Sequence, residues 1–411
     1  MSATTLAPED PDRLGFDPAR LARLGRLLDA YVAEGRLPGW QLLVARHDRL
    51  AYAGRGGHRD VEAGLPVEDD TIFRIYSMTK PLTSVAVMSL VEEGRLELAD
   101  PVARYLPAFA QPRVYRGGPS TAPFTVPATE PIRVWHLLTH TAGLSYGFHD
   151  HHPVDVMYQR AGFAWGSPRD VDAQGAAARF AALPLLFEPG TSWTYSVATD
   201  VLGALVEVVS GQTLDRFLAE RVTGPLGMVD TAFAVPAEHQ GRVAALYSPG
   251  PGGRIARVAS AQVPTEPPTF LSGGGGLLGT AADYLRFCEA IRLGGALEGT
   301  RLLAPRTVEL MGANHLPGGA DLESFGERLY AESPFTGTGF GLGFAVLLDP
   351  AQAKSFGSPG ELSWGGAAST AFWVDRALGI SVVFCTQLLP SNTLPVRSQL
   401  RTLVYQALLE P

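Results

Sequence analysis

The chain has 411 residues, of which 46% are hydrophobic and 18% are charged, as is typical of a globular protein with a large buried core. Its formal net charge is −8 and it has no block of five like charges, so neither a nucleic acid nor an anionic membrane surface is the expected partner. No apolar run is long enough to cross a bilayer, and the acidic N-terminal segment lacks the apolar core of a signal peptide. The sequence therefore predicts a cytoplasmic protein without a membrane partner.

The first part of the chain predicts two helices with a β-hairpin between them. Asp17 precedes a proline and a series of leucines that ends at Gly35, which predicts a one-faced helix with Asp17 as its N-cap. Two short apolar runs at 40–48 and 49–57 predict the hairpin. A second helix is expected from Ser77 to Glu93, before a terminating glycine.

Helices dominate the middle of the chain, and strands return near its end. Glycine-terminated apolar segments predict helices at 197–211, 213–227 and 279–295. Runs rich in Phe and Val predict strands at 339–349, 369–375 and 380–387, and a last helix is expected over 393–410.

These elements predict an α/β protein of the α+β type. An antiparallel sheet built from both termini is flanked by helices, and a mostly helical domain is inserted between its two halves. The expected sheet domain comprises residues 1–95 and 285–411, and the expected helical domain comprises 96–284. Cys288 and Cys385 match no metal or redox spacing, which predicts two buried thiols in a reducing compartment.

Lysine is rare in this chain and one lysine follows a serine closely. Lys80 and Lys354 are the only lysines, and Lys80 lies three residues after Ser77, so the two side chains share one face of the predicted helix. Pro81 belongs in a first helical turn, which places Ser77 at the helix N-terminus. A desolvated lysine can lose its proton and activate a serine hydroxyl, whereas arginine cannot. A capping serine beside a solvated lysine is the alternative.

Two further segments have residue types that suit acyl transfer. Tyr195 lies where a Pro/Gly loop meets a helix, and an ammonium beside it would lower the pKa of its phenol and make it a base. Gly365 and Gly366 precede a predicted strand whose edge could offer an N–H to a developing oxyanion, together with the N–H of Ser77. Taken singly, Tyr195 also fits a core aromatic residue and the glycines fit a tight turn.

In this order, the three motifs resemble those of the serine β-lactamase and penicillin-binding superfamily, S-x-x-K, Y-x-N and K-T-G. The resemblance is closest to the family VIII carboxylesterases and extends from about Phe16 to the C-terminus. The segments that carry it are SMTKP, LLTHTAGL, WTYSVATDVLG, SGGGGLLGTAADYLRF and WGGAAST.

The resemblance implies a β-lactamase-like fold and a role for each matching residue. Ser77 is similar to the family's nucleophile, Lys80 to the partner that lowers a pKa, and Tyr195 to the base. Trp364, Gly365 and Gly366 stand where the lactamases have K-T-G, which implies the N–H of Ala367 as the second oxyanion donor.

Two positions depart from the lactamase pattern. Val197 stands where lactamases keep an asparagine, and Trp364 replaces the lysine that helps to bind the substrate carboxylate. Both changes remove polar recognition of a penicillin and leave acyl transfer intact, so neutral esters are the expected substrates.

Other motifs are expected not to be catalytic. Gly143–Gly147 matches the G-x-S-x-G elbow of α/β-hydrolases, but a helix-like segment precedes it where the elbow needs a strand, so Ser145 is not the expected nucleophile. Tyr146 and Phe148 in the same loop are expected to line a substrate pocket.

The histidines and the glycine-rich segment are also given structural roles. His149, His151 and His152 lack zinc-type spacing, which predicts a solvated loop and no metal site. His140 is expected to be a hydrogen-bonded structural residue, and Gly273–Gly276 to provide backbone clearance beside the cleft.

The sequence thus predicts a serine carboxylesterase that cleaves short or medium acyl esters through an acyl-enzyme on Ser77. A β-lactamase or D-aminopeptidase-type amidase, an acyltransferase with the same site, and a non-catalytic binder of acyl ligands remain alternatives. No cofactor is implied, the partner is a small-molecule ester, and the oligomeric state is left open.

Overall fold

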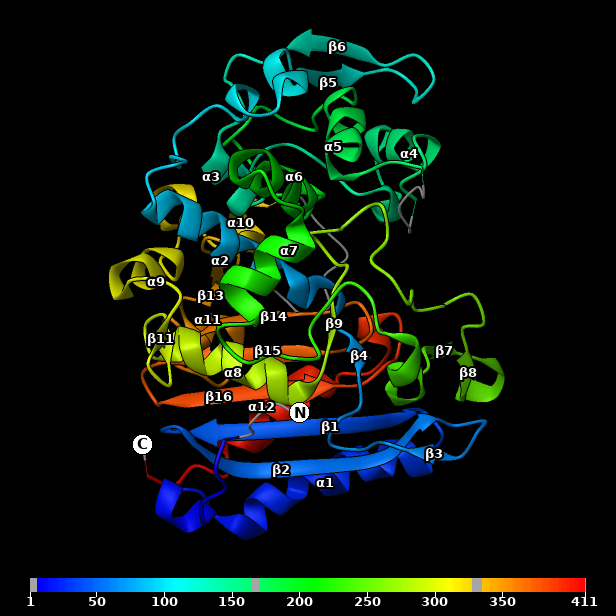
Figure 1. Ribbon diagram of the computed structural model, residues 1–411, viewed down its shortest axis with the longest axis vertical. Coiled ribbons are helices and arrows are strands. Elements are labelled where there is room, and N and C mark those ends of the chain that lie inside the picture. Colours follow the sequence, from blue (N-terminus) through cyan, green and yellow to red (C-terminus); the bar gives the residue numbers. More distant parts are fainter. Residues whose placement is uncertain (1–5, 165–169, 327–334, 411) are drawn as a thin grey trace.

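A computed structural model describes residues 6–164, 170–326 and 335–410. At the centre of this part of the chain lies an eight-stranded sheet in which all strand pairs are antiparallel (Figure 1). In spatial order its strands are β12 (Thr338–Phe340), β13 (Ala345–Leu347), β14 (Leu362–Gly365), β15 (Ala371–Asp375), β16 (Ile380–Cys385), β1 (Gly39–Arg46), β2 (Arg49–Asp60) and β3 (Leu65–Pro66).

A strand from the N-terminal part of the chain pairs with one from the C-terminal part in the interior of this sheet. The expected hairpin is formed by β1 and β2, and its turn residues His47 and Asp48 have φ values of 49° and 65°. On its other side β1 pairs with β16, so that Gln41 lies opposite Cys385. The predicted antiparallel sheet built from both termini is confirmed.

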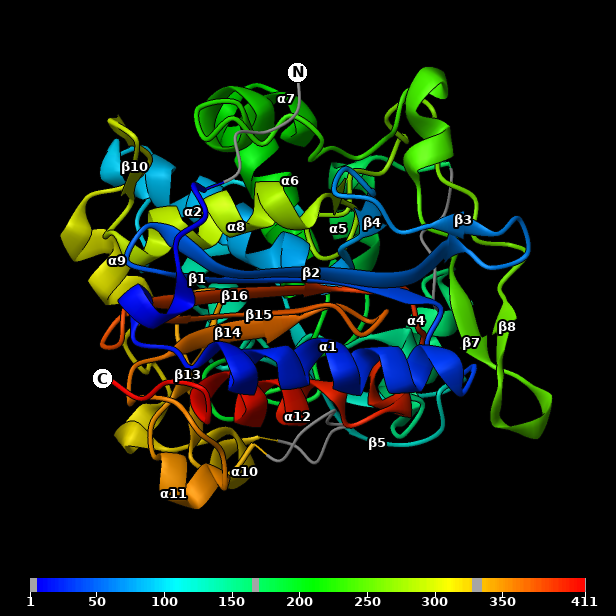
Figure 2. The same cartoon turned by 90° about the horizontal axis from the view of Figure 1, so that it is seen from below.

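Helices cover both faces of the sheet (Figure 2). One face is covered by α1 (Pro18–Ala33) and α12 (Val396–Tyr405), the other by α8 (Ala281–Arg292). The helix α2 (Thr79–Glu92) lies on the same side of the sheet as α8 and packs against the helical layer described below. As predicted, the Asp17 carboxylate caps α1 by accepting the N–H of Arg20. Leucines of α1 and valines of α12 form one apolar core with β1, and a larger core lies on the opposite face of the sheet.

Above the sheet lies a layer of mostly helical segments (Figure 1). Its helices are α3 (Val134–Leu138), α4 (Pro153–Arg160), α5 (Ala173–Ala181), α6 (Ala198–Ser210) and α7 (Leu214–Leu218), and a hairpin of β5 (Arg113–Gly117) and β6 (Phe124–Pro127) lies at its outer edge. The helix expected over 213–227 is shorter, because α7 passes into a π-helical turn that ends at Thr223, just before Gly224 and Pro225. The division into 1–95 with 285–411 and 96–284 stays a prediction, and its boundary at 284/285 falls within α8.

Short elements complete the described chain. They are the pairs β4 (Phe73–Arg74) with β9 (Leu278–Gly279), β7 (Tyr247–Pro249) with β8 (Ile255–Arg257) and β10 (Ala296–Leu297) with β11 (Thr300–Arg301), and the helices α9 (Pro305–Met311), α10 (Leu322–Phe325) and α11 (Pro350–Ala353). Among the described residues, no helix combines the length and the apolar character that crossing a bilayer requires. Cys288 and Cys385 are both buried free thiols, as predicted.

Candidate active site

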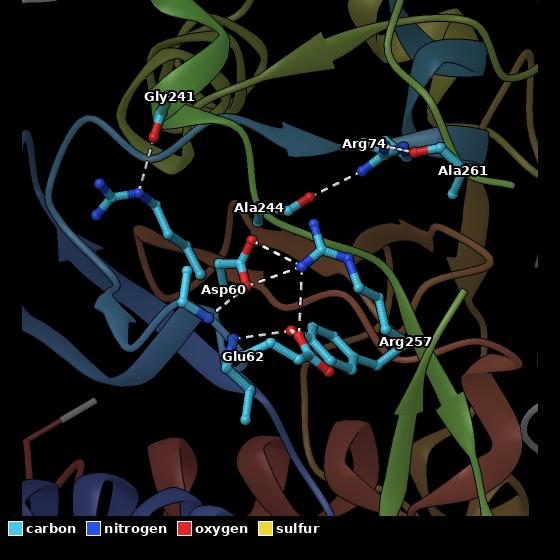
Figure 3. Close-up of polar contacts among 11 residues, drawn as sticks. Asp60, Glu62, Arg74, Gly241, Ala244, Arg257 and Ala261 are labelled. Atoms are coloured by element: carbon cyan, nitrogen blue, oxygen red, sulfur yellow. Dashed lines mark hydrogen bonds and ion pairs between the residues drawn. The ribbon is translucent and has the colours of Figure 1, made fainter. Parts of the chain in front are cut away.

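The strand that leads to Ser77 is held firmly in place. Arg74 in β4 donates hydrogen bonds to the carbonyls of Ala244, at 2.8 Å, and Ala261 (Figure 3). The segment that carries these carbonyls is itself tied to the end of β2, because Arg257 contacts both oxygens of Asp60 at 2.9 Å. The backbone just before Ser77 is therefore linked through the 244–261 segment to the end of β2.

Ser77 lies in a single 3₁₀ turn between β4 and α2. The turn comprises Tyr76–Met78, and α2 begins at Thr79, two residues later than expected for a helix that starts at Ser77. Tyr76 has a φ of 44°, a left-handed conformation that turns the chain sharply just before the serine. This turn presents the Ser77 hydroxyl at the end of a buried helix.

Lys80 and Ser77 meet as their spacing predicts. The Nζ of Lys80 lies 3.3 Å from the Oγ of Ser77 and donates to the carbonyl of Gly274 at 2.6 Å. Lys80 is only 2% exposed, and this burial lowers the pKa of its amine to about 7, although the carboxylate of Asp200 acts in the opposite direction. Near neutral pH, a large fraction of Lys80 is therefore uncharged and able to accept a proton.

Tyr195 lies beside both Lys80 and Ser77. Its ring centre is 4.4 Å from the Nζ of Lys80, its phenol is within hydrogen-bonding reach of Ser77, and the indole N–H of Trp364 lies 3.4 Å from its oxygen. Burial raises the pKa of Tyr195, so the phenol is protonated in the resting state. The expectation that Lys80 keeps Tyr195 acidic is therefore not met, because desolvation outweighs the hydrogen bonds to the phenol.

The end of β14 packs against the segment that carries Ser77. A Cβ on Gly366 would lie 2.4 Å from the carbonyl oxygen of Ile75, so only glycine allows this approach. The N–H of Gly366 donates to the carbonyl of Thr370 at 2.9 Å, which closes the turn that contains Ala367. Arg397 holds the same turn by donating to the carbonyls of Gly366 and Thr370, at 2.6 and 2.7 Å. The turn lies where an oxyanion donor is expected, and the role of Ala367 stays a prediction.

Aromatic side chains extend the site outward. The ring of Tyr146 lies 5.3 Å from that of Tyr195 and 5.5 Å from the Nζ of Lys80. Phe148 stacks on Tyr146 at 4.5 Å and is 40% exposed, so these two predicted pocket residues lie between the candidate catalytic groups and solvent. Val197, which stands where lactamases have their asparagine, is buried and offers no amide to a substrate.

The other candidate residues have structural partners. The Ser145 hydroxyl is fully buried and donates to Asp155 at 2.5 Å, away from the Ser77 pocket. His140 Nδ1 pairs with the Ser196 hydroxyl at 3.2 Å, in agreement with its predicted structural role. His152 accepts the N–H of Val154 and caps α4.

The expectation of a solvated histidine loop is wrong for His149. This residue is buried, and its Nε2 donates to the carbonyl of Tyr195 at 2.7 Å. It thereby supports the backbone of the predicted base. The sequence holds no local signal for this contact, because the two residues are 46 positions apart.

The sequence alone did not single out Asp200, a buried carboxyl group whose charge acts on Lys80. It lies five residues after Tyr195, in the first turn of α6, and its carboxylate accepts the N–H of Gly274 at 2.9 Å. A Cβ on Gly274 would lie 2.8 Å from this carboxylate, which agrees with the backbone clearance predicted for Gly273–Gly276. The one signal for Asp200 in the sequence is its position five residues after Tyr195, within the segment WTYSVATDVLG.

Comparison with known proteins agrees with this geometry. Residues 24–406 match the family described as Beta-lactamase. Esterase EstB of Burkholderia gladioli is 38% identical over 402 residues, which cover 93% of this chain and 94% of EstB.

Solved structures give the same result. The structure of EstCE1, described as a hydrolase with promiscuous acyltransferase activity, has a TM-score of 0.78 at 30% identity and covers 94% of this chain and 99% of its own. A mutant simvastatin synthase LovD from Aspergillus terreus has a TM-score of 0.77 at 26% identity and covers 95% of both chains. The chain therefore belongs to the beta-lactamase family and groups within it with the family VIII esterases, a set of serine hydrolases.

Proposed function

We propose that this protein is a serine carboxylesterase that cleaves short or medium acyl esters through an acyl-enzyme on Ser77. The observation that carries the proposal is a buried Lys80 amine, with a pKa of about 7, only 3.3 Å from the Ser77 hydroxyl. A nucleophile and a base within hydrogen-bonding reach are the minimum that covalent acyl transfer needs.

In the first half-reaction, the uncharged amine of Lys80 takes the proton of Ser77 while its Oγ attacks the ester carbonyl. The negative charge on the carbonyl oxygen is stabilised by the N–H groups of Ser77 and Ala367. As the ester C–O bond breaks, the Tyr195 phenol gives its proton to the leaving alcohol and is reprotonated by the ammonium of Lys80. The products are the free alcohol and an ester of Ser77.

In the second half-reaction, a water molecule gives a proton to Lys80, through Tyr195, and attacks the acyl carbon. The acid leaves, and Ser77 regains its proton. This assignment differs from the sequence-based one in making Lys80 the resting base and Tyr195 the resting acid, because the phenol pKa is raised and the amine pKa is lowered.

The walls of the pocket favour neutral substrates. Trp364 stands where lactamases have a lysine, and it presents an indole instead of a cation. Tyr146 and Phe148 offer stacked apolar surface for an acyl chain or an alcohol group. Ester hydrolysis is therefore expected to exceed lactam hydrolysis.

Transfer of the acyl group to an alcohol is the second candidate activity. It is supported by relatives such as the acyltransferase CalJ of Penicillium decumbens, 28% identical over 353 residues, and by the acyltransferase activity stated for EstCE1. The same acyl-enzyme serves both reactions, since only the acceptor differs.

The test is a panel of esters, amides and lactams on the wild type and on Ser77→Ala. The substitution should lower kcat/KM for p-nitrophenyl butyrate by about 10³-fold or more, with an unchanged melting temperature. Ser145→Ala is the matched control, because that serine lies in the rival motif and is expected to retain esterase activity.

Each rival has its own readout. Retained activity in Ser77→Ala would refute the nucleophile, and nitrocefin hydrolysis as fast as ester hydrolysis would favour a lactamase. A wild-type protein that no fluorophosphonate labels would point to a non-catalytic binder. New ester formed in excess alcohol would reveal acyl transfer.

A further inference from the structure

Asp200 is an uncommon feature of this pocket, because a carboxyl group is almost completely enclosed beside the catalytic residues. Its side chain comes from the first turn of α6 and is 5% exposed. One oxygen, Oδ1, accepts both the hydroxyl of Ser272 at 2.6 Å and the N–H of Gly274 at 2.9 Å. Nothing in the mechanism proposed above uses this carboxylate.

Gly274 is hydrogen-bonded to both Asp200 and Lys80. Gly274 gives its N–H to Asp200 and accepts the Lys80 amine on its carbonyl at 2.6 Å. The neighbouring carbonyl of Gly273 accepts the hydroxyl of Thr83, one turn further along α2. The glycine-rich segment is thus fixed between the two helices, and the position of the amine follows from it.

The charge of Asp200 also reaches the amine. Among the described residues, the ionisable groups that face Lys80 are Asp200 from α6 and, from the loops around it, Tyr195, Tyr146 and His140. Arg397 on α12 lies further out and interacts with Tyr195. Asp200 alone in this set carries a carboxyl group, and its effect is to raise the pKa of Lys80 against the stronger effect of burial.

We propose that Asp200 is a positioning residue for acyl transfer. It fixes the Lys80 amine through Gly274, and its negative charge favours the protonated form of that amine. The inference rests on the proposed function, in which Lys80 is the base. Asp200 touches neither the substrate nor the reacting atoms, so it acts on kcat and on the pH profile and not on substrate affinity.

Asp200→Asn separates charge from geometry. The amide has the same shape, and its oxygen can keep both hydrogen bonds of Oδ1, while the negative charge is lost. Without that charge the pKa of Lys80 falls further, so the acidic limb of the kcat/KM profile should move to lower pH by about one unit. The limb of Asp283→Asn, the matched control, should stay in place, because Asp283 makes a similar pair of bonds, to Asp230 and Thr231, outside the pocket.

Gly274→Ala tests the geometry with the charge kept. The added Cβ would lie 2.8 Å from Asp200 and must push the segment away from it, whereas the Cβ of Gly275→Ala meets only ordinary contacts at 3.8 Å or more. We expect kcat to fall about 10-fold or more in Gly274→Ala, with KM nearly unchanged, and to fall much less in Gly275→Ala.

An acidic limb that stays in place in Asp200→Asn, or equal losses in the two alanine variants, would overturn the inference. If Asp200→Asn does not fold, the comparison of the two glycine variants decides. The pH dependence of fluorophosphonate labelling of Ser77 gives a second readout. Failure of the proposed function is distinct, because Ser77 would then not be labelled or Ser77→Ala would remain active.

Discussion

At the scale of single residues, the site depends on a lysine where the rest of the chain uses arginine. Lys80 is one of two lysines among 33 basic residues. Burial makes its amine a base near neutral pH, which an arginine in the same place could not become. The second lysine, Lys354, lies at the C-terminal end of α11 in a short surface turn.

The lysine pair provides a matched test of this chemistry. Because the Lys80 amine must be uncharged to take the serine proton, wild-type kcat/KM should rise with pH through about 7 and then level off. Lys80→Arg should lose about 10³-fold in kcat/KM at every pH, whereas Lys354→Arg should behave as the wild type. A flat wild-type profile between pH 6 and 8, measured with a neutral ester, would contradict this role.

At the scale of elements, short helices around the site are fixed by individual side chains. The five-residue helix α3 leads into the loop that carries His140, and His136 closes its first turn by accepting the N–H of Arg133 at 3.0 Å. Burial lowers the pKa of His136 to about 4, so the ring stays uncharged in the folded protein. Because protonation of His136 would break this cap, the stability of the mostly helical layer depends on pH.

The sign of that link follows from proton binding. Between pH 6.5 and about 4 the unfolded chain protonates His136 and the folded one does not, so the free energy of unfolding falls as the pH falls. The loss amounts to about 3 kcal/mol across this range. His136→Gln keeps an acceptor for the same N–H and does not titrate, so its unfolding free energy should decrease less with acid. Urea denaturation of both proteins at pH 7 and pH 5 would measure the difference, and equal decreases would exclude His136 as the cause.

At the scale of the whole molecule, side chains of the last helix, α12, bond to acidic residues of the central sheet and of the segment just before β14. Arg401 of α12 forms an ion pair with Glu361, which is 1% exposed and lies just before β14. The Tyr405 hydroxyl bonds to the same Glu361 at 2.6 Å and lies 2.9 Å from the carboxylate of Asp375 in β15. The C-terminal helix is thereby tied to β14 and β15, the two strands that flank the turn that contains Ala367.

Removal of one partner should leave a buried charge without compensation. We expect Arg401→Ala to lower the free energy of unfolding by about 3–5 kcal/mol in urea denaturation. Arg306→Ala, which removes a solvent-exposed ion pair with Glu309, should change it by less than about 1 kcal/mol. Similar values for the two variants would show that the Glu361 pair contributes little.

Local patterns allowed most elements to be predicted. The N-cap of α1, the hairpin of β1 and β2, the helix α8 and the strands β15 and β16 all follow from residues adjacent in sequence. The predicted start of the Ser77 helix and the end of the 213–227 helix were wrong by a few residues, because a 3₁₀ turn and a π-helical turn depend on neighbours elsewhere in the fold.

By itself, the sequence determined the α+β class, from the periodicity of its segments, and the pairing of Ser77 with Lys80, from side chains three residues apart on a helix. It determined the superfamily through the resemblance of five ordered motifs. Only the tertiary structure decided the direction of each pKa, the support of Tyr195 by His149 and the enclosure of Asp200 beside Lys80. Desolvation and hydrogen bonds between distant segments depend on what surrounds a group in space, and neighbours in sequence do not specify those surroundings.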